Sequence, residues 1–180
     1  MGGVDKGLQL LNGRPLVAHV LERLRPQVDA VLINANRHRD EYASFGCPVV
    51  ADADGSFSGP LAGVLAGLRQ TRTAWLLGVP CDSPHLPLDL AARLAAGLDD
   101  SIDVTVPVTA DGRIQPVFCL LRCSLHAELN RYLSAGGRKV ETWLLAQKHR
   151  LVRFDQPGDD ATFFNANTLA ELRGLENRHA

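Results

Sequence analysis

The sequence has no surplus of charge of either sign. Its 19 lysine and arginine residues are balanced by 20 aspartate and glutamate residues, giving a formal net charge of -1 at pH 7. A strongly basic surface, which would attract nucleic acid or an anionic membrane, is therefore not expected. Long hydrophobic runs are also missing, because no apolar stretch approaches the roughly 20 residues of a membrane-spanning helix. We expect a soluble protein without a nucleic-acid or membrane partner.

Cysteine is scarce, and its spacing matches no known cysteine motif. Cys47, Cys81, Cys119 and Cys123 form no Cys-x-x-Cys pair, and none has a histidine at zinc-like spacing. This pattern argues against a zinc site or a redox centre. Cys81 and Cys119 lie in or beside apolar runs, so we expect both to be buried as small hydrophobic side chains. Because the N-terminus shows no signal peptide, a cytoplasmic location is expected.

Several catalytic and cofactor-binding signatures are also missing. The chain contains neither the Walker loop Gly-x-x-x-x-Gly-Lys-Ser/Thr nor the dinucleotide turn Gly-x-Gly-x-x-Gly. It offers no Ser-His-Asp or Cys-His pattern at a usable spacing. These absences argue against a dinucleotide oxidoreductase and against catalysis through a covalent nucleophile.

What the sequence does contain is an alternation of short apolar runs and amphipathic segments, which predicts an α/β fold. A chain of 180 residues fits a single domain, spanning residues 1–180. The Asp111-Gly112 pair predicts a hairpin, and hence one antiparallel excursion from a mostly parallel sheet. We expect strands at 31–33, 48–51, 74–79, 102–108, 114–121 and 151–154, and helices at 15–26, from residue 60, at 88–98, 124–133, 140–147 and 169–172.

Local patterns add detail to three of these segments. The first helix should bury one stripe of side chains, formed by Leu16, Val17, Val20, Leu21 and Leu24. Residues 37–42 are predicted to be an exposed polar segment, and residues 159–160 to lie in a loop. The last helix has a capping box formed by Thr168 and Glu171.

Polar side chains follow three of the predicted strands. Asn34, Asp52 and Asp82 each come just after a short apolar run. In an open parallel sheet, ligands bind outside the carboxyl ends of the strands. Asp82 could hold Mg²⁺ against a substrate phosphate there, and the Asn34 amide could contact a base edge. The alternatives are a turn or capping role for Asp82 and an Asx-turn for Asn34.

Glycine gathers at two places where a nucleotide could approach the backbone. Gly2, Gly3 and Gly7 surround Lys6, whose ammonium group could contact a phosphate; the alternative is a frayed glycine-rich terminus. Gly59, Gly63 and Gly67 share one face of the helix that begins near Pro60. This face could accept a nucleotide at the helix N-terminus or pack tightly on a strand, and we assign Gly67 to packing.

Two further groups remain open between a structural and a binding role. Arg138 and Lys139 precede a helix, where cations are unfavourable unless an anion lies nearby; the alternative is a solvated surface pair. Asn165 and Asn167 would point to one side of an extended segment. They could be turn residues or ligand contacts.

Together, five segments resemble one family, the molybdenum cofactor guanylyltransferases (MobA proteins). They occur in the family's order and cover nearly the whole chain: Met1-Gly2-Gly3-Val4-Asp5-Lys6-Gly7, Asn34-Ala35-Asn36-Arg37, Gly59-Pro60-Leu61-Ala62-Gly63, Pro80-Cys81-Asp82-Ser83-Pro84 and Asn165-Ala166-Asn167-Thr168.

The resemblance implies a three-layer, Rossmann-like α/β sandwich. It implies an Mg²⁺-dependent enzyme that joins GMP from GTP to the phosphate of molybdopterin cofactor and releases pyrophosphate. It further implies a monomer with transient contacts to other cofactor-biosynthesis proteins. The roles carried over are GTP phosphate contact for Lys6, guanosine recognition for Asn34 and Asp52, Mg²⁺ binding for Asp82, and cleft positions on the nucleotide or pterin side for Gly59, Gly63, Arg138, Asn165 and Asn167.

One departure from the family pattern lies at the N-terminus. Family members begin with an apolar strand and a loop resembling Leu-Ala-Gly-Gly-x-Ser-x-Arg-Met-Gly, whereas this chain starts at the final Met-Gly. We therefore expect the sheet to lack a central strand and the site to lack part of its phosphate-binding loop. Two alternatives to a guanylyltransferase stay open. One is a related nucleotidyltransferase that uses CTP or a sugar phosphate, and the other is a truncated, non-catalytic binding module.

Overall fold

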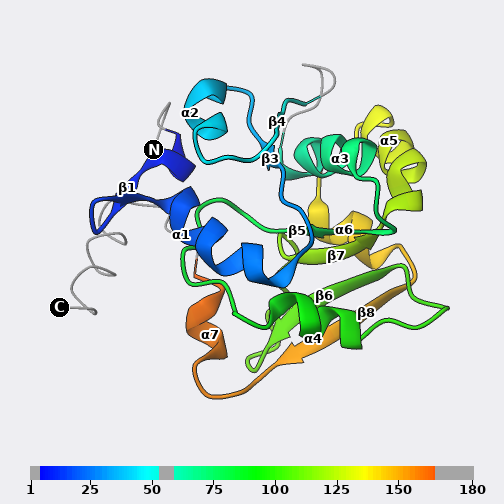
Figure 1. Cartoon of the computed structure of the whole chain (residues 1–180). Helices are drawn as coiled ribbons and strands as arrows, with labels where there is room; N and C mark the ends of the chain where they lie inside the picture. The colour runs from blue at the N-terminus through cyan, green and yellow to red at the C-terminus, as the bar shows by residue number, and fades with distance from the viewer. Residues whose placement is uncertain (1–4, 53–58, 165–180) are drawn as a thin grey trace.

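Figure 1 shows the computed structural model of the chain, which describes residues 5–52 and 59–164. The predicted α/β alternation is present along the described residues. The elements in chain order are η1 (Lys6–Leu8), β1 (Leu10–Leu11), β2 (Arg14–Pro15), α1 (Leu16–Leu24), η2 (Arg25–Gln27), β3 (Ile33–Asn34), α2 (Arg39–Ala43), β4 (Val49–Val50), α3 (Pro60–Gln70), β5 (Trp75–Gly78), α4 (Leu90–Ala96), β6 (Val104–Thr109), β7 (Cys119–Arg122), η3 (Cys123–Leu125), α5 (His126–Ser134), α6 (Val140–Leu145), β8 (His149–Phe154) and α7 (Asp159–Thr162).

The main sheet has four strands in the order β5-β7-β6-β8. β7 runs antiparallel to both of its neighbours, whereas β6 and β8 are parallel. β5, β6 and β8 therefore point the same way. Strands β3 and β4 form a separate parallel pair, with Ile33 opposite Val49 and Asn34 opposite Val50. The prediction of a mostly parallel fold with one antiparallel excursion is confirmed.

Helices cover both faces of the main sheet, which confirms the expected three-layer arrangement (Figure 1). On one face, Val104 and Val106 of β6 pack with buried leucines of α3 and α5 and with Trp143 of α6. On the other face, Leu94 of α4 packs in one cluster with Phe154 of β8 and with a valine of α1. The sheet is therefore apolar on both sides, as expected for strands covered by helices on both faces.

The local pattern predicted α1 closely. Its buried residues are the predicted five, Leu16, Val17, Val20, Leu21 and Leu24. The hairpin β1–β2 precedes it, with a two-residue turn at Asn12-Gly13 in which both residues have positive φ, 51° and 74°. Asn-Gly favours this turn type because both residues adopt such angles at low cost. The α-helix ends before η2, which contains Pro26.

Three local predictions were wrong or held only in part. Residues 37–41 are exposed, as predicted, but the segment contains the start of α2, and Tyr42 is buried with 3% of its surface exposed. The loop predicted at 159–160 is the start of α7, where Asp159 pairs with Arg93 at 3.0 Å. The strand predicted at 114–121 becomes regular only at Cys119, after Pro116, which cannot donate a ladder hydrogen bond. Contacts with distant residues hold the two short helices, so local periodicity did not reveal them.

Close packing and burial tested three smaller predictions. A Cβ at Gly67 would lie 3.1 Å from a methyl group of Leu76, so Gly67 permits α3 to pack on β5, as predicted. Cys119 is buried, and burial raises the pKa of its thiol to about 12. Cys81 was predicted to be buried but is exposed. Among the described residues, no helix has the length and apolarity that crossing a membrane requires.

Candidate functional site

Asn34, Asn36 and Asp52 meet at the carboxyl ends of β3 and β4. Asn34 Nδ2 donates to Asp52 Oδ1 at 3.0 Å, and Asn36 Nδ2 donates to Asp52 Oδ2 at 2.7 Å. The Asp52 backbone N–H donates to Asn36 Oδ1 at 2.9 Å. The parallel register of β3 and β4 brings these residues together. The Asn34 amide therefore bonds the neighbouring strand end, at Val50 and Asp52, in place of a local Asx-turn.

Gly63 leaves room for the Asn34 side chain. It lies in the first turns of α3, and a Cβ placed on it would come 2.5 Å from Asn34 Oδ1. Such a distance is much shorter than van der Waals contact, so any larger residue would push the Asn34 amide aside. The structure thus brings together three of the predicted nucleotide residues: Asn34, Asp52 and Gly63.

Lys6 and Asp82 form a second pair of predicted residues. Lys6 lies in η1, and Asp82 lies in the turn after β5. Lys6 Nζ is 3.4 Å from Asp82 Oδ2. The Asp82 side chain is 11% exposed and the Lys6 side chain 42% exposed, so a nearly buried carboxylate faces a solvent-accessible ammonium group. A phosphate could approach this ammonium from the solvent side.

Sequence reasoning missed two residues that connect these groups. Tyr42 of α2 donates a hydrogen bond from its hydroxyl to Asp5 Oδ1. Burial, with the Asp5 hydrogen bond as a further cause, raises the pKa of Tyr42 well above its usual range. Asp5 caps η1 by accepting from the backbone N–H of Gly7 at 3.2 Å. The Asp-x-Gly spacing at 5–7 was the only local signal for this cap, and nothing local indicated Tyr42.

A cleft of about 330 Å³ lies beside Asn34 and includes the chain neighbours of Lys6 and Asp82 in its lining. It is lined by Asp5, Asn34, Ala35, Asn36, Arg37, His38, Tyr42 and Cys81. Asn34 and Asn36 represent the strand-end cluster, while Asp5 and Cys81 are the chain neighbours of Lys6 and Asp82. A second cavity, of about 420 Å³, is lined by residues of α1, Arg14, Arg25 and Phe45. It contains none of the predicted residues, so the smaller cleft is the candidate site.

The other predicted residues that the structure describes, Arg138 and Gly59, are not among the residues that line this cleft. Arg138 donates to the carbonyl oxygens of Leu133 and Gly137, at 2.8 and 2.6 Å. Its guanidinium therefore provides a hydrogen-bond donor for a carbonyl group near the C-terminal end of α5. This structural role accounts for a cation at this position without a bound anion. Gly59 is the N-cap of α3, with φ of 97° and ψ of 177°, and is exposed. Asn165 and Asn167, like the capping box at 168–171, lie outside the described residues.

The described residues could bind a magnesium ion only if the substrate supplied some of its ligands. Within residues 5–52 and 59–164, no three aspartate, glutamate, histidine or cysteine side chains converge into a metal cage. Mg²⁺ is commonly bound by one or two carboxylates, with substrate phosphates and water as the remaining ligands. The single, largely buried carboxylate of Asp82 is compatible with that kind of site.

Comparisons with known proteins show the family and the fold of this chain. Residues 1–151 match the family model described as "MobA-like NTP transferase domain". The chain is 52% identical, over 187 residues, to a curated protein of Ralstonia nicotianae called molybdenum cofactor guanylyltransferase. The alignment covers 99% of this chain and 90% of that protein.

Solved structures share the fold at low sequence identity. Molybdopterin-guanine dinucleotide biosynthesis protein A from Archaeoglobus fulgidus superposes with a TM-score of 0.78 at 21% identity, covering 98% of this chain and 91% of that one. A 2-C-methyl-D-erythritol 4-phosphate cytidylyltransferase from Thermus thermophilus gives a TM-score of 0.71 at 16% identity, covering 97% and 93%. These likenesses show a nucleotidyltransferase fold, but the fold alone does not separate GTP from CTP.

Proposed function

Because this chain belongs to the MobA-like family of molybdenum cofactor guanylyltransferases, we propose that it transfers GMP from GTP to the phosphate of molybdopterin cofactor and releases pyrophosphate. The observation that carries the proposal is the cleft, which is lined by Asn34 and Asn36 of the strand-end cluster and by Asp5 and Cys81, the chain neighbours of the Lys6–Asp82 pair. We place the guanosine at the cluster and the phosphates at the pair. In this proposal the elements act as one nucleotidyltransferase domain.

The strand-end cluster suits a guanine base and its ribose. Guanine offers N–H donors on its Watson–Crick edge and an acceptor oxygen at O6. The Asp52 carboxylate can accept from such donors, and the amides of Asn34 and Asn36 can donate and accept. The hydrogen bonds among these three side chains fix their orientation before the ligand arrives. Such preorganisation lowers the entropy cost of binding.

Lys6 and Asp82 suit the reacting phosphates. In-line attack on the α-phosphate by the phosphate of the acceptor develops negative charge on the leaving pyrophosphate. The Lys6 ammonium can stabilise that charge without leaving its place beside Asp82. Asp82 would hold Mg²⁺, which when bound neutralises phosphate charge as a Lewis acid. No covalent intermediate on the protein is needed.

Replacing Gly63 by alanine should weaken guanosine binding without weakening the fold. Alanine favours the helix by about 1 kcal/mol over glycine, but its Cβ would displace the flexible end of Asn34. The lost hydrogen bonds should raise the KM for GTP by about 10- to 100-fold. Steady-state kinetics and thermal unfolding measure the two effects.

Gly67→Ala is the matched control, because it makes the same exchange in the same helix but meets a movable methyl group of Leu76. Its KM for GTP should stay close to that of the parent chain. Equal KM changes in both variants would remove Gly63 and Asn34 from nucleotide recognition.

The proposed function is tested by comparing nucleotides. With Mg²⁺ present, GTP at 100 times its Kd should stabilise the chain by about 2.7 kcal/mol, whereas CTP should have little effect. Pyrophosphate release should then require both GTP and molybdopterin cofactor. Stabilisation by CTP alone would overturn the guanosine assignment. Binding of GTP without any pyrophosphate release would indicate a binding module in place of an enzyme.

A further inference from the structure

Tyr42 lies where three segments of the candidate site come together. It belongs to α2, which follows the strand-end loop, residues 34–38, where Asn34 ends β3 and Asn36 lies just beyond it. Its side chain is buried in a cluster with Ile33 of β3 and with Ala35 of the strand-end loop. Its hydroxyl points away from this apolar cluster to Asp5, just ahead of η1. The hydroxyl thus joins the strand-end loop to the segment that carries Lys6.

The backbone around Gly7 shows how tightly these segments fit. A Cβ on Gly7 would lie 2.4 Å from Tyr42 Oη and 3.1 Å from Cys81 Sγ. Gly7 therefore lets η1, α2 and the turn before Asp82 approach one another. Since Asp5 also accepts from the Gly7 N–H, one carboxylate fixes both the first turn of η1 and the Tyr42 side chain.

The hydrogen bond from Tyr42 persists at neutral pH. Burial and the bond to Asp5 hold the pKa of Tyr42 well above its usual range, so the hydroxyl stays protonated and donates. The Asp5 carboxylate accepts, and hydrogen bonds to charged acceptors are stronger than those between neutral groups. The contact is therefore a lasting part of the site at working pH.

We propose that Tyr42 is a positioning residue, which acts through Asp5 to hold Lys6 opposite Asp82 while the strand-end loop holds the guanosine. The inference rests on the proposed function and deepens it. It names the contact that fixes the Lys6 segment, where we place the phosphates, relative to the strand-end loop, where we place the guanosine. Lys6 is the group that contacts the phosphates in this scheme. Tyr42 lines the cleft, but its hydroxyl is engaged by Asp5. In this scheme it acts through that bond, so its loss should affect the chemical step more than the binding of GTP.

The first test is Tyr42→Phe, which removes one hydroxyl from the buried ring. We expect kcat for GMP transfer to fall about 10-fold, with the KM for GTP changed by less than about 3-fold. Tyr132→Phe is the control, because that hydroxyl also donates a hydrogen bond, to the backbone carbonyl of Lys139, and Tyr132 does not line the cleft. Its kcat should match that of the parent chain.

A second pair of variants tests the same link from the other side. Asp5→Asn keeps an acceptor oxygen for Tyr42 and Gly7, whereas Asp5→Ala removes it. Asp5→Asn should therefore lose less kcat than Asp5→Ala, and this ranking is informative even if Tyr42→Phe folds poorly. Equal losses in the two Asp5 variants, or an unchanged kcat in Tyr42→Phe, would overturn the positioning role. If the parent chain itself transfers no GMP, the proposed function fails instead, and the two failures are thereby distinguished.

Discussion

The Asp82→Asn variant is expected to lose about 1000-fold in the rate of GMP transfer, equivalent to about 4 kcal/mol in the activation barrier. The exchange keeps the shape of the side chain but removes its charge. The neutral amide would bind Mg²⁺ weakly, and Lys6 would lose the carboxylate that lies 3.4 Å from its ammonium nitrogen. Both groups that face the phosphates would therefore be disturbed at once.

The fold should survive this exchange. The Asp82 side chain is only 11% exposed, and a neutral amide costs less to bury than a carboxylate. Thermal unfolding should therefore stay near that of the parent chain, so that lost activity can be assigned to chemistry. The rate should be measured against Mg²⁺ concentration, because a metal ligand should also shift the Mg²⁺ dependence.

Asp99→Asn provides a matched control for charge removal. Asp99 also pairs with a cation, Arg150, but both side chains are nearly half exposed and lie outside the cleft. Its loss should leave the transfer rate and the Mg²⁺ dependence unchanged. Turnover in Asp82→Asn equal to that of Asp99→Asn would remove Asp82 from the metal role.

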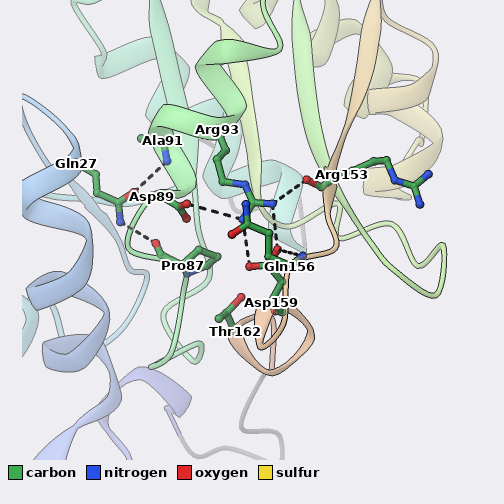
Figure 2. A network of polar contacts seen from close by, with 9 residues as sticks. All are labelled: Gln27, Pro87, Asp89, Ala91, Arg93, Arg153, Gln156, Asp159 and Thr162. Carbon is green, nitrogen blue, oxygen red and sulfur yellow. Dashed lines mark hydrogen bonds and ion pairs between the residues drawn. The ribbon is translucent and has the colours of Figure 1, made fainter.

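The largest expected effect on stability is that of Arg93→Ala, about 3 kcal/mol in the free energy of unfolding. Figure 2 shows Arg93 of α4 pointing into the space between β8 and α7. Its guanidinium donates to both carboxylate oxygens of Asp159, at 3.1 and 3.0 Å, and to the carbonyl oxygen of Arg153 at 2.8 Å. It also lies 3.7 Å from the centre of the Phe154 ring.

Burial makes this pair stronger than an ordinary surface ion pair. The side chains of Arg93 and Asp159 are 18% and 12% exposed, so solvent screens them only in part. Removing Arg93 would leave the Asp159 carboxylate without its cation partner and would expose one face of Phe154. For a chain of this size, about 3 kcal/mol corresponds to a fall of roughly 6–12 °C in Tm.

Arg153→Ala is the control for Arg93→Ala. In Figure 2 the Arg153 side chain points away from the network, which uses only its backbone carbonyl. Its ion pair with Asp155 is exposed and should contribute less than about 1 kcal/mol. Chemical denaturation of both variants gives the comparison. Equal losses in stability would mean that the Arg93–Asp159 pair contributes no more than a surface pair.

The Arg93 network also holds α7 near the sheet face that α1 and α4 cover. α7 leads directly to Phe163, whose ring packs edge-on against Phe118 and Phe154 at centroid distances of 5.1 Å. On the other side of α4, Gln27 donates to the carbonyl of Pro87 and accepts from the N–H of Ala91 (Figure 2). Side-chain hydrogen bonds therefore hold α4 at its N-terminal end, through Gln27, and in its middle, through Arg93.

The sequence by itself determined the features that depend on short-range periodicity. The buried stripe of α1 follows from residues three and four apart, and the strand ends that carry Asn34 and Asp52 follow from short apolar runs. The five family segments, read in order, predicted the family that the comparisons confirm. Each of these signals lies within a few residues of chain, where backbone geometry limits the possible structures.

Only the tertiary structure decided which of these residues meet and what else holds them. The Tyr42–Asp5 hydrogen bond joins residues 37 apart, and the Arg93–Asp159 pair joins residues 66 apart. Neither contact leaves a local pattern, because a tyrosine in a polar segment or an aspartate in a loop is compatible with many folds. Arg138 is a further example. Its sequence neighbours did not indicate that its guanidinium donates to the carbonyl oxygen of Leu133, near the end of α5. Packing over long sequence separations selects one arrangement among those that the local signals allow.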